Sequence, residues 1–96
     1  MKNKELIKYL VENNDYKYNL LKTAEELKEL SLILTQMALK KEKVDKQEVI
    51  DEIGDVKIRL KVIQHFFSRK KVKERIKFKL DKFRSYIKED KYKGGI

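Results

Sequence analysis

The stretches EELKEL at residues 25–30 and EVIDEIGD at residues 48–55 decide the fold and the candidate chemistry of this chain. Each contains two carboxylates three residues apart: Glu26 and Glu29 in the first, Glu52 and Asp55 in the second. Residues at i and i+3 share one face of an α-helix, with Cβ atoms about 5–6 Å apart. Two such helices packed antiparallel would bring four carboxylates together. Four hard oxygen donors in one place predict a divalent-cation site, suited to Mg²⁺ or Mn²⁺.

Length and composition limit the class of protein. The chain of 96 residues predicts a single domain, 1–96, with a modest core. It has no proline and is rich in Lys, Glu, Leu and Ile, which is typical of all-α proteins. Cysteine is absent, so disulfides and thiolate metal sites are excluded. No apolar run is long enough for a signal peptide or a membrane span, and we therefore expect a cytoplasmic protein.

The positive charge is concentrated in the second half of the chain. Residues 1–55 have a net charge of −2, whereas residues 56–96 have +11. This asymmetry favours a polyanionic partner, either a nucleic acid or a small molecule that carries phosphates. The alternative is that the lysines form a solvated surface with no specific partner.

Apolar residues recur at helical spacing in four segments, which predicts a four-helix-bundle-like subunit. The expected helices cover residues of about 4–13, 16–41, 46–67 and 72–91. Asp45 followed by Glu48 resembles a capping box at the start of the third helix. A short charged connection joins the second and third helices, so we expect them to pack antiparallel. The third helix is apolar on several faces, which predicts burial against another copy and hence a homodimer or homotetramer.

The expected inward faces of the two long helices are apolar. In the second helix the stripe consists of Leu20, Leu21, Ala24, Leu27, Leu30 or Ser31, Leu34 and Ala38. In the third helix it consists of Val49, Ile53, Val56, Leu60, Ile63 and Phe67. Gly54 interrupts the third helix at a cost of about 1 kcal/mol relative to alanine. It allows either close packing of a facing helix or room for a ligand between Glu52 and Asp55, and both interpretations stay open.

The spacing of the two acidic motifs, ExxE and then ExxD after 22 residues, resembles that of the MazG-like all-α nucleoside triphosphate pyrophosphohydrolases. EELKEL at 25–30 is similar to the EELxEL of that family, and DEIGDV at 51–56 to its EExGDV. The similarity is best to the short, single-domain, phage- or Firmicute-type members. It extends from about Tyr16 to Ile87, and outside the two motifs it is much less specific.

This resemblance implies a Mg²⁺-dependent enzyme that hydrolyses a nucleoside triphosphate to the monophosphate and pyrophosphate. The implied cellular role is house-cleaning of the nucleotide pool. The implied metal ligands are Glu26, Glu29, Glu52 and Asp55. The base that takes the proton of the attacking water is Glu25 or Glu29, and the sequence leaves this choice open. The implied substrate contacts are Asn19, Lys22, Lys79, Lys82 and Arg84.

A non-enzymatic basic helical module that binds nucleic acid or a protein is the competing hypothesis. Its support is the basic half of the chain, in which aromatic residues alternate with the basic ones: Phe78, Phe83, Tyr86 and Tyr92. It does not explain the paired spacing of the carboxylates. We therefore favour the hydrolase, with a nucleoside triphosphate as the partner and without nucleic acid or a membrane. His65 is the only histidine, and the chain has no glycine-rich phosphate loop.

Overall fold

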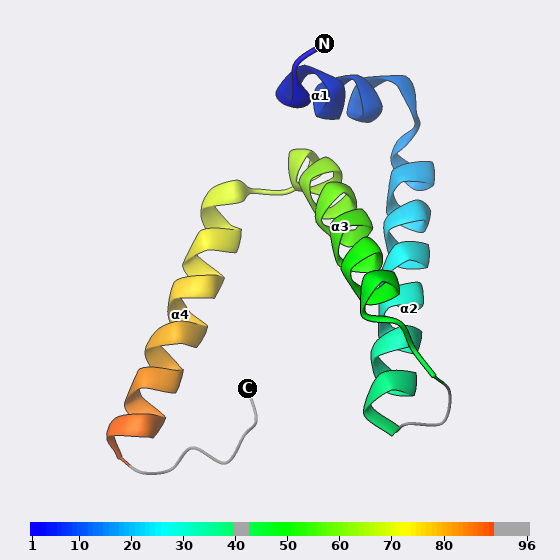
Figure 1. The fold of residues 1–96 in the computed structure, drawn as a ribbon. Helices are drawn as coiled ribbons and strands as arrows, with labels where there is room; N and C mark the ends of the chain where they lie inside the picture. The colour runs from blue at the N-terminus through cyan, green and yellow to red at the C-terminus, as the bar shows by residue number, and fades with distance from the viewer. Residues whose placement is uncertain (40–42, 90–96) are drawn as a thin grey trace. The chain divides into compact units, whose positions relative to one another are not determined.

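The computed structural model describes residues 1–39 and 43–89, and in these ranges the chain forms α-helices and no strand (Figure 1). The four α-helices are α1 Asn3–Asn13, α2 Tyr16–Leu39, α3 Lys46–Ile63 and α4 Arg69–Lys88, and a short 3-10 helix, η1 Gln64–Phe66, follows α3. The all-α prediction is confirmed. The expected ends of the second and fourth helices, at 40–41 and 90–91, lie outside the described residues.

The chain divides into two compact units, Met1–Phe66 and Phe67–Ile96, and each is described by itself. In the first unit α2 and α3 lie side by side and run antiparallel, as predicted, and α1 contacts α3 (Figure 1). The second unit contains α4, none of whose residues is buried. The four-helix bundle and its assembly from several copies stay predictions. No described helix is both long and apolar enough to cross a membrane.

Side-chain caps determine where three helices begin. A helix leaves its first N–H groups without partners, and an Asp or Ser just before it accepts a hydrogen bond from one of them. These bonds join Asp15 Oδ1 to the N–H of Tyr18 at 2.6 Å, Asp45 Oδ1 to that of Gln47 at 3.0 Å, and Ser68 Oγ to that of Lys71 at 3.2 Å. The predicted cap at Asp45 is thus present.

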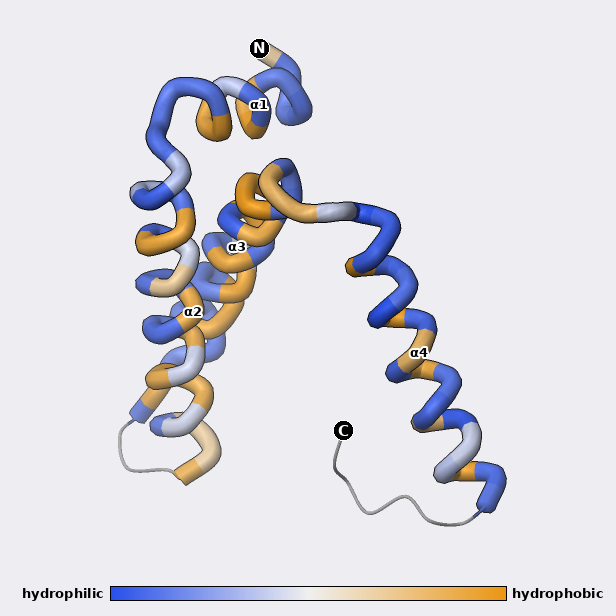
Figure 2. Tube along the Cα trace, turned by 180° about the vertical axis from the view of Figure 1, so that it is seen from behind, coloured by the Kyte–Doolittle hydropathy of each residue, from blue (hydrophilic) through white to orange (hydrophobic). Residues whose placement is uncertain are grey.

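The contact between α2 and α3 is more polar than the predicted stripes. The buried apolar residues of α3 are Val56 and Val62, whereas the buried residues of α2 are Asn19 and Thr23. Large apolar residues of both predicted stripes stay exposed by 39–60 %: Leu21, Leu27, Leu34, Ile53 and Leu60. Figure 2 shows such apolar positions distributed along both helices.

The spacing of the buried residues explains this difference. Asn19, Thr23 and Glu26 follow i, i+4, i+7 on α2, and Glu52, Val56 and Arg59 do so on α3, so each set occupies one face. The two helices are therefore rotated relative to the prediction, so that these mixed faces meet.

Candidate metal centre

Three of the four predicted metal ligands converge at the contact between α2 and α3. Glu26 on α2 and Glu52 and Asp55 on α3 each offer one carboxylate oxygen, and these oxygens lie within 4.8 Å of one another. We expected Glu26 and Glu52 within a helix diameter of each other, and this is confirmed. A Mg²⁺ ion needs oxygens about 2.1 Å away, so small side-chain movements would let the three coordinate one ion.

The two glutamates of this group have buried oxygens without partners. Oε2 of Glu26 and Oε2 of Glu52 are buried and accept no hydrogen bond. The Glu26 side chain is only 13 % exposed, whereas Asp55 is exposed. Burying a carboxylate without a partner is unfavourable, and a buried polar atom left unpaired in a native structure points to a missing ion or water. The group therefore has the oxygen ligands that a cation needs, and it has negative charge that no hydrogen-bond donor balances at the two buried oxygens.

Burial raises the pKa of the Glu26 carboxyl, and the neighbouring acids Glu29 and Asp55 add to the effect. Lys22 acts in the opposite direction because its ammonium group stabilises the charged carboxylate. Because the pKa of Glu26 is still raised, Lys22 compensates the negative charge of this carboxylate only in part. A divalent cation would complete the compensation.

Lys22 forms ion pairs with two carboxylates of α2. Its Nζ lies 3.5 Å from Oε2 of Glu25 and 3.6 Å from Oε1 of Glu26. Glu25, and after it Glu26, raises the pKa of Lys22 against the opposing effect of burial. The predicted substrate contact Lys22 thus lies beside Glu26, a member of the group of three carboxylates.

The two candidate bases are both exposed, and neither belongs to the group of three. Glu29 contributes to the raised pKa of Glu26, which places it beside that side chain. Glu25 is exposed and forms an ion pair with Lys22. Glu29, the predicted fourth ligand, is therefore one helical turn from Glu26 but outside the group of three carboxylates.

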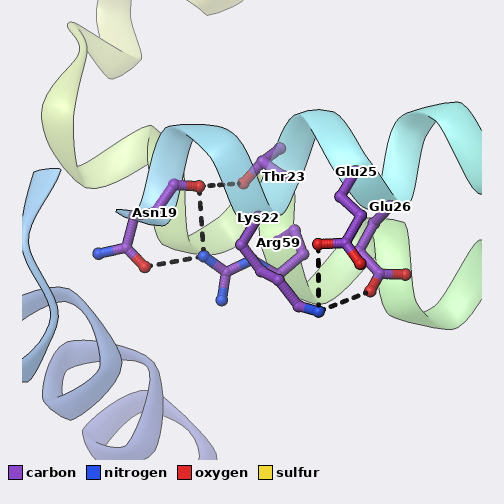
Figure 3. A network of polar contacts seen from close by, with 6 residues as sticks. All are labelled: Asn19, Lys22, Thr23, Glu25, Glu26 and Arg59. Atoms are coloured by element: carbon purple, nitrogen blue, oxygen red, sulfur yellow. Dashed lines mark hydrogen bonds and ion pairs between the residues drawn. The ribbon is translucent and has the colours of Figure 1, made fainter. Parts of the chain in front are cut away.

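A buried polar network adjoins this group along the same two helix faces (Figure 3). Arg59 on α3 is only 9 % exposed, and its Nη2 donates to Oδ1 of Asn19 at 2.7 Å and to the backbone oxygen of Asn19 at 3.3 Å. Thr23 Oγ1 donates to the same backbone oxygen at 2.8 Å. Asn19 is completely buried, and its Nδ2 donates to the backbone oxygen of Leu10 at 3.4 Å. Both polar atoms of the Asn19 side-chain amide therefore form hydrogen bonds within the protein, Oδ1 with Arg59 and Nδ2 with Leu10.

The sequence reasoning missed Arg59. A signal for it was present, because Arg59 is four residues after Asp55 and continues the face that contains Glu52 and Val56. The sequence led to no prediction for this residue, because a single basic residue in a helix does not by itself indicate a buried position.

The remaining predicted phosphate contacts lie on α4, in the second unit. Lys79 is half-buried, the ammonium of Lys82 lies 5.6 Å from the ring centre of Tyr86, and Arg84 pairs with Asp81 at 2.9 Å. Their role toward a substrate stays a prediction.

Gly54 lies in open space on α3. A Cβ atom placed there would meet no atom within 4 Å. The close packing considered for Gly54 is therefore absent among the described residues of one chain, and the space beside Glu52 and Asp55 stays free.

No known protein family, curated protein or solved structure matches this chain. The resemblance to the MazG-like hydrolases therefore rests on the two acidic motifs alone.

Proposed function

We propose that the protein is a Mg²⁺-dependent nucleoside triphosphate pyrophosphohydrolase, with Mn²⁺ as an alternative metal. The observation that carries the proposal is the pair of buried, unpartnered oxygens of Glu26 and Glu52, contributed by two helices and joined by Asp55. Lys22 pairs only with the other oxygen of Glu26, Oε1, at 3.6 Å, so both Oε2 atoms stay available to a cation.

The chain's own residues have distinct tasks in this proposal. Glu26, Glu52 and Asp55 would hold the ion, and Glu29, one helical turn along α2 from Glu26, is the proposed fourth ligand. Bound there, Mg²⁺ would neutralise the charge of the triphosphate and lower the pKa of a bound water. Water attacks the phosphorus next to the sugar, the bond to the pyrophosphate breaks, and Glu25 or Glu29 takes the proton of the water. Lys22 leaves Glu26 and contacts a phosphate oxygen.

We also propose that the protein is a homodimer or homotetramer. Apolar side chains on both helices of the first unit are exposed, with Leu21, Leu32 and Ile50 exposed by 59–60 %. A small monomer rarely leaves so many large apolar side chains in water, because their burial stabilises an assembly by about 25 cal/mol per Å². Light scattering at micromolar concentration tests this proposal, and a stable monomer would contradict it.

The decisive test of the activity is incubation with a panel of canonical and modified nucleoside triphosphates and Mg²⁺, with pyrophosphate release as the readout. The proposal requires release that depends on Mg²⁺ and is lost with EDTA. Absence of release across the panel, with Mg²⁺ and with Mn²⁺, would overturn it.

The basic helix α4 favours a second candidate, binding of nucleic acid or of an acidic protein without chemistry. α4 contains ten basic and two acidic residues, and the guanidinium of Arg75 lies 5.0 Å from the ring centre of the exposed Phe78. Basic side chains next to exposed aromatic rings are common in surfaces that bind nucleic acids. Binding that persists in EDTA and in Glu52→Gln, without hydrolysis, would support this candidate over the enzyme.

A further inference from the structure

Arg59 is a buried cation without an anionic partner. None of the ion pairs found among residues 1–39 and 43–89 includes it, and its two hydrogen bonds go to the neutral oxygens of Asn19. Its Nε is buried and has no partner. A buried charge is normally paired, because its removal from water is otherwise strongly unfavourable. The guanidinium therefore lacks one negative group.

The missing anion has a natural position relative to the carboxylates. Arg59 follows Asp55 by four residues, so the two positions are separated by a rise of about 6 Å along α3. The contact between α2 and α3 thus has carboxylate oxygens without partners and, about one helical turn away, the unpartnered Nε of Arg59. A ligand that satisfies both presents a cation at one end and an anionic group, such as a phosphate, at the other.

We propose that Arg59 binds the phosphate chain of the substrate, as the anion-binding residue contributed by the same helix pair that holds the metal. This inference rests on the proposed function and adds a polyphosphate-binding residue to it. The ligand class is therefore a metal-bound diphosphate or triphosphate, with Nε–H of Arg59 donating to a phosphate oxygen. Asn19 keeps the guanidinium in place through Nη2.

Pyrophosphate, a product that needs no catalysis to bind, is the probe. Titration calorimetry of the full chain with pyrophosphate and Mg²⁺ is compared for the wild type, Arg59→Met and Arg59→Lys. A hydrogen bond from a charged donor is worth enough for a loss of about tenfold or more in affinity in Arg59→Met. Arg59→Lys keeps the charge but cannot hold Asn19 and the phosphate together, so we expect a smaller loss. Lys57→Met, which removes an exposed positive charge from α3, is the matched control and should bind as the wild type does.

A second readout follows the Arg59 side chain of the wild-type protein directly. In the ¹⁵N-labelled protein, the Nε–H signal of Arg59 should shift when magnesium pyrophosphate is added, while those of Arg69 and Arg75 stay in place. The Arg59→Lys spectrum identifies the signal. This measurement keeps the inference testable even where Arg59→Met fails to fold.

The outcomes separate this inference from the proposed function. Unchanged pyrophosphate affinity in Arg59→Met, an unshifted Nε–H signal, or no binding by the wild type overturns the role of Arg59. Absence of pyrophosphate release from nucleoside triphosphates overturns the enzyme, even where Arg59-dependent binding is observed. Loss of folding stability in Arg59→Met with unchanged affinity would show that the residue only joins the helices.

Discussion

Arg59 and Asn19, forty residues apart in the chain, join α3 to α2 through a buried hydrogen bond of 2.7 Å between Nη2 and Oδ1. Asn19 also extends toward α1 through its bond to the backbone oxygen of Leu10. One amide therefore connects three helices of the first unit. We expect this connection to contribute to stability regardless of any ligand.

Asn19→Ala should destabilise the protein by about 1–3 kcal/mol, because it leaves the buried guanidinium of Arg59 without its side-chain acceptor. Urea unfolding at a constant protein concentration measures the change. Asn13→Ala is the control, since the Asn13 amide is exposed and bonds only within α1, to the backbone oxygen of Tyr9. Equal effects of the two substitutions would show that the buried network is not a stabilising feature.

Glu52→Gln should reduce pyrophosphate release by at least about 100-fold, since removal of a metal ligand costs no less than removal of a group that supports one. Its metal-free stability should be kept or raised, because the substitution removes a buried carboxylate charge without a partner. Turnover and the metal-free melting temperature are the two measurements. Glu48→Gln, at an exposed acid in the first turn of α3, should leave turnover unchanged. A large loss of metal-free stability in Glu52→Gln would instead identify the carboxylate as part of the scaffold.

The raised pKa of Glu26 predicts how the metal-free protein responds to pH. The folded state holds this proton more tightly than the unfolded state, so the contribution of Glu26 to stability is present below its ordinary pKa of 4.5 and is lost as the pH rises through the folded value. In EDTA, Glu26→Gln should therefore be more stable than the wild type at pH 7, and the difference should shrink as the pH falls below 4.5. Urea unfolding of both proteins, at pH values from 7 to below 4.5, measures this difference in the free energy of unfolding. A less stable Glu26→Gln at pH 7 would mean that the ion pair with Lys22 dominates.

Gly54→Ala tests what occupies the space beside Glu52 and Asp55. Since an added Cβ meets no atom within 4 Å, the substitution should stabilise α3 by about 1 kcal/mol through helix propensity. The reverse change at an exposed position of α2, Ala24→Gly, should cost about the same amount and calibrates the effect. Destabilisation by Gly54→Ala would show that another copy of the chain packs against this glycine. Unchanged stability with weaker pyrophosphate binding would show that the space serves a ligand.

The sequence by itself determined the helices and the location of the candidate chemistry. Helical periodicity and the caps at Asp15 and Asp45 depend on residues within a few positions of one another, so they can be predicted without the tertiary structure. The same holds for the carboxylate pairs, since i, i+3 spacing places two residues on one face wherever the helix lies. The antiparallel pairing of α2 and α3 followed from their short connection.

Only the tertiary structure decided which faces meet. Both long helices are apolar over a wide arc, so periodicity permits several rotations of one helix about its axis relative to the other. The observed rotation makes Asn19 and Arg59 a buried pair, unites Glu26 with Glu52 and Asp55, and leaves Glu29 beside them. The physical reason is that a contact between helices depends on the fit and hydrogen bonding of side chains from both, which no single segment of sequence contains.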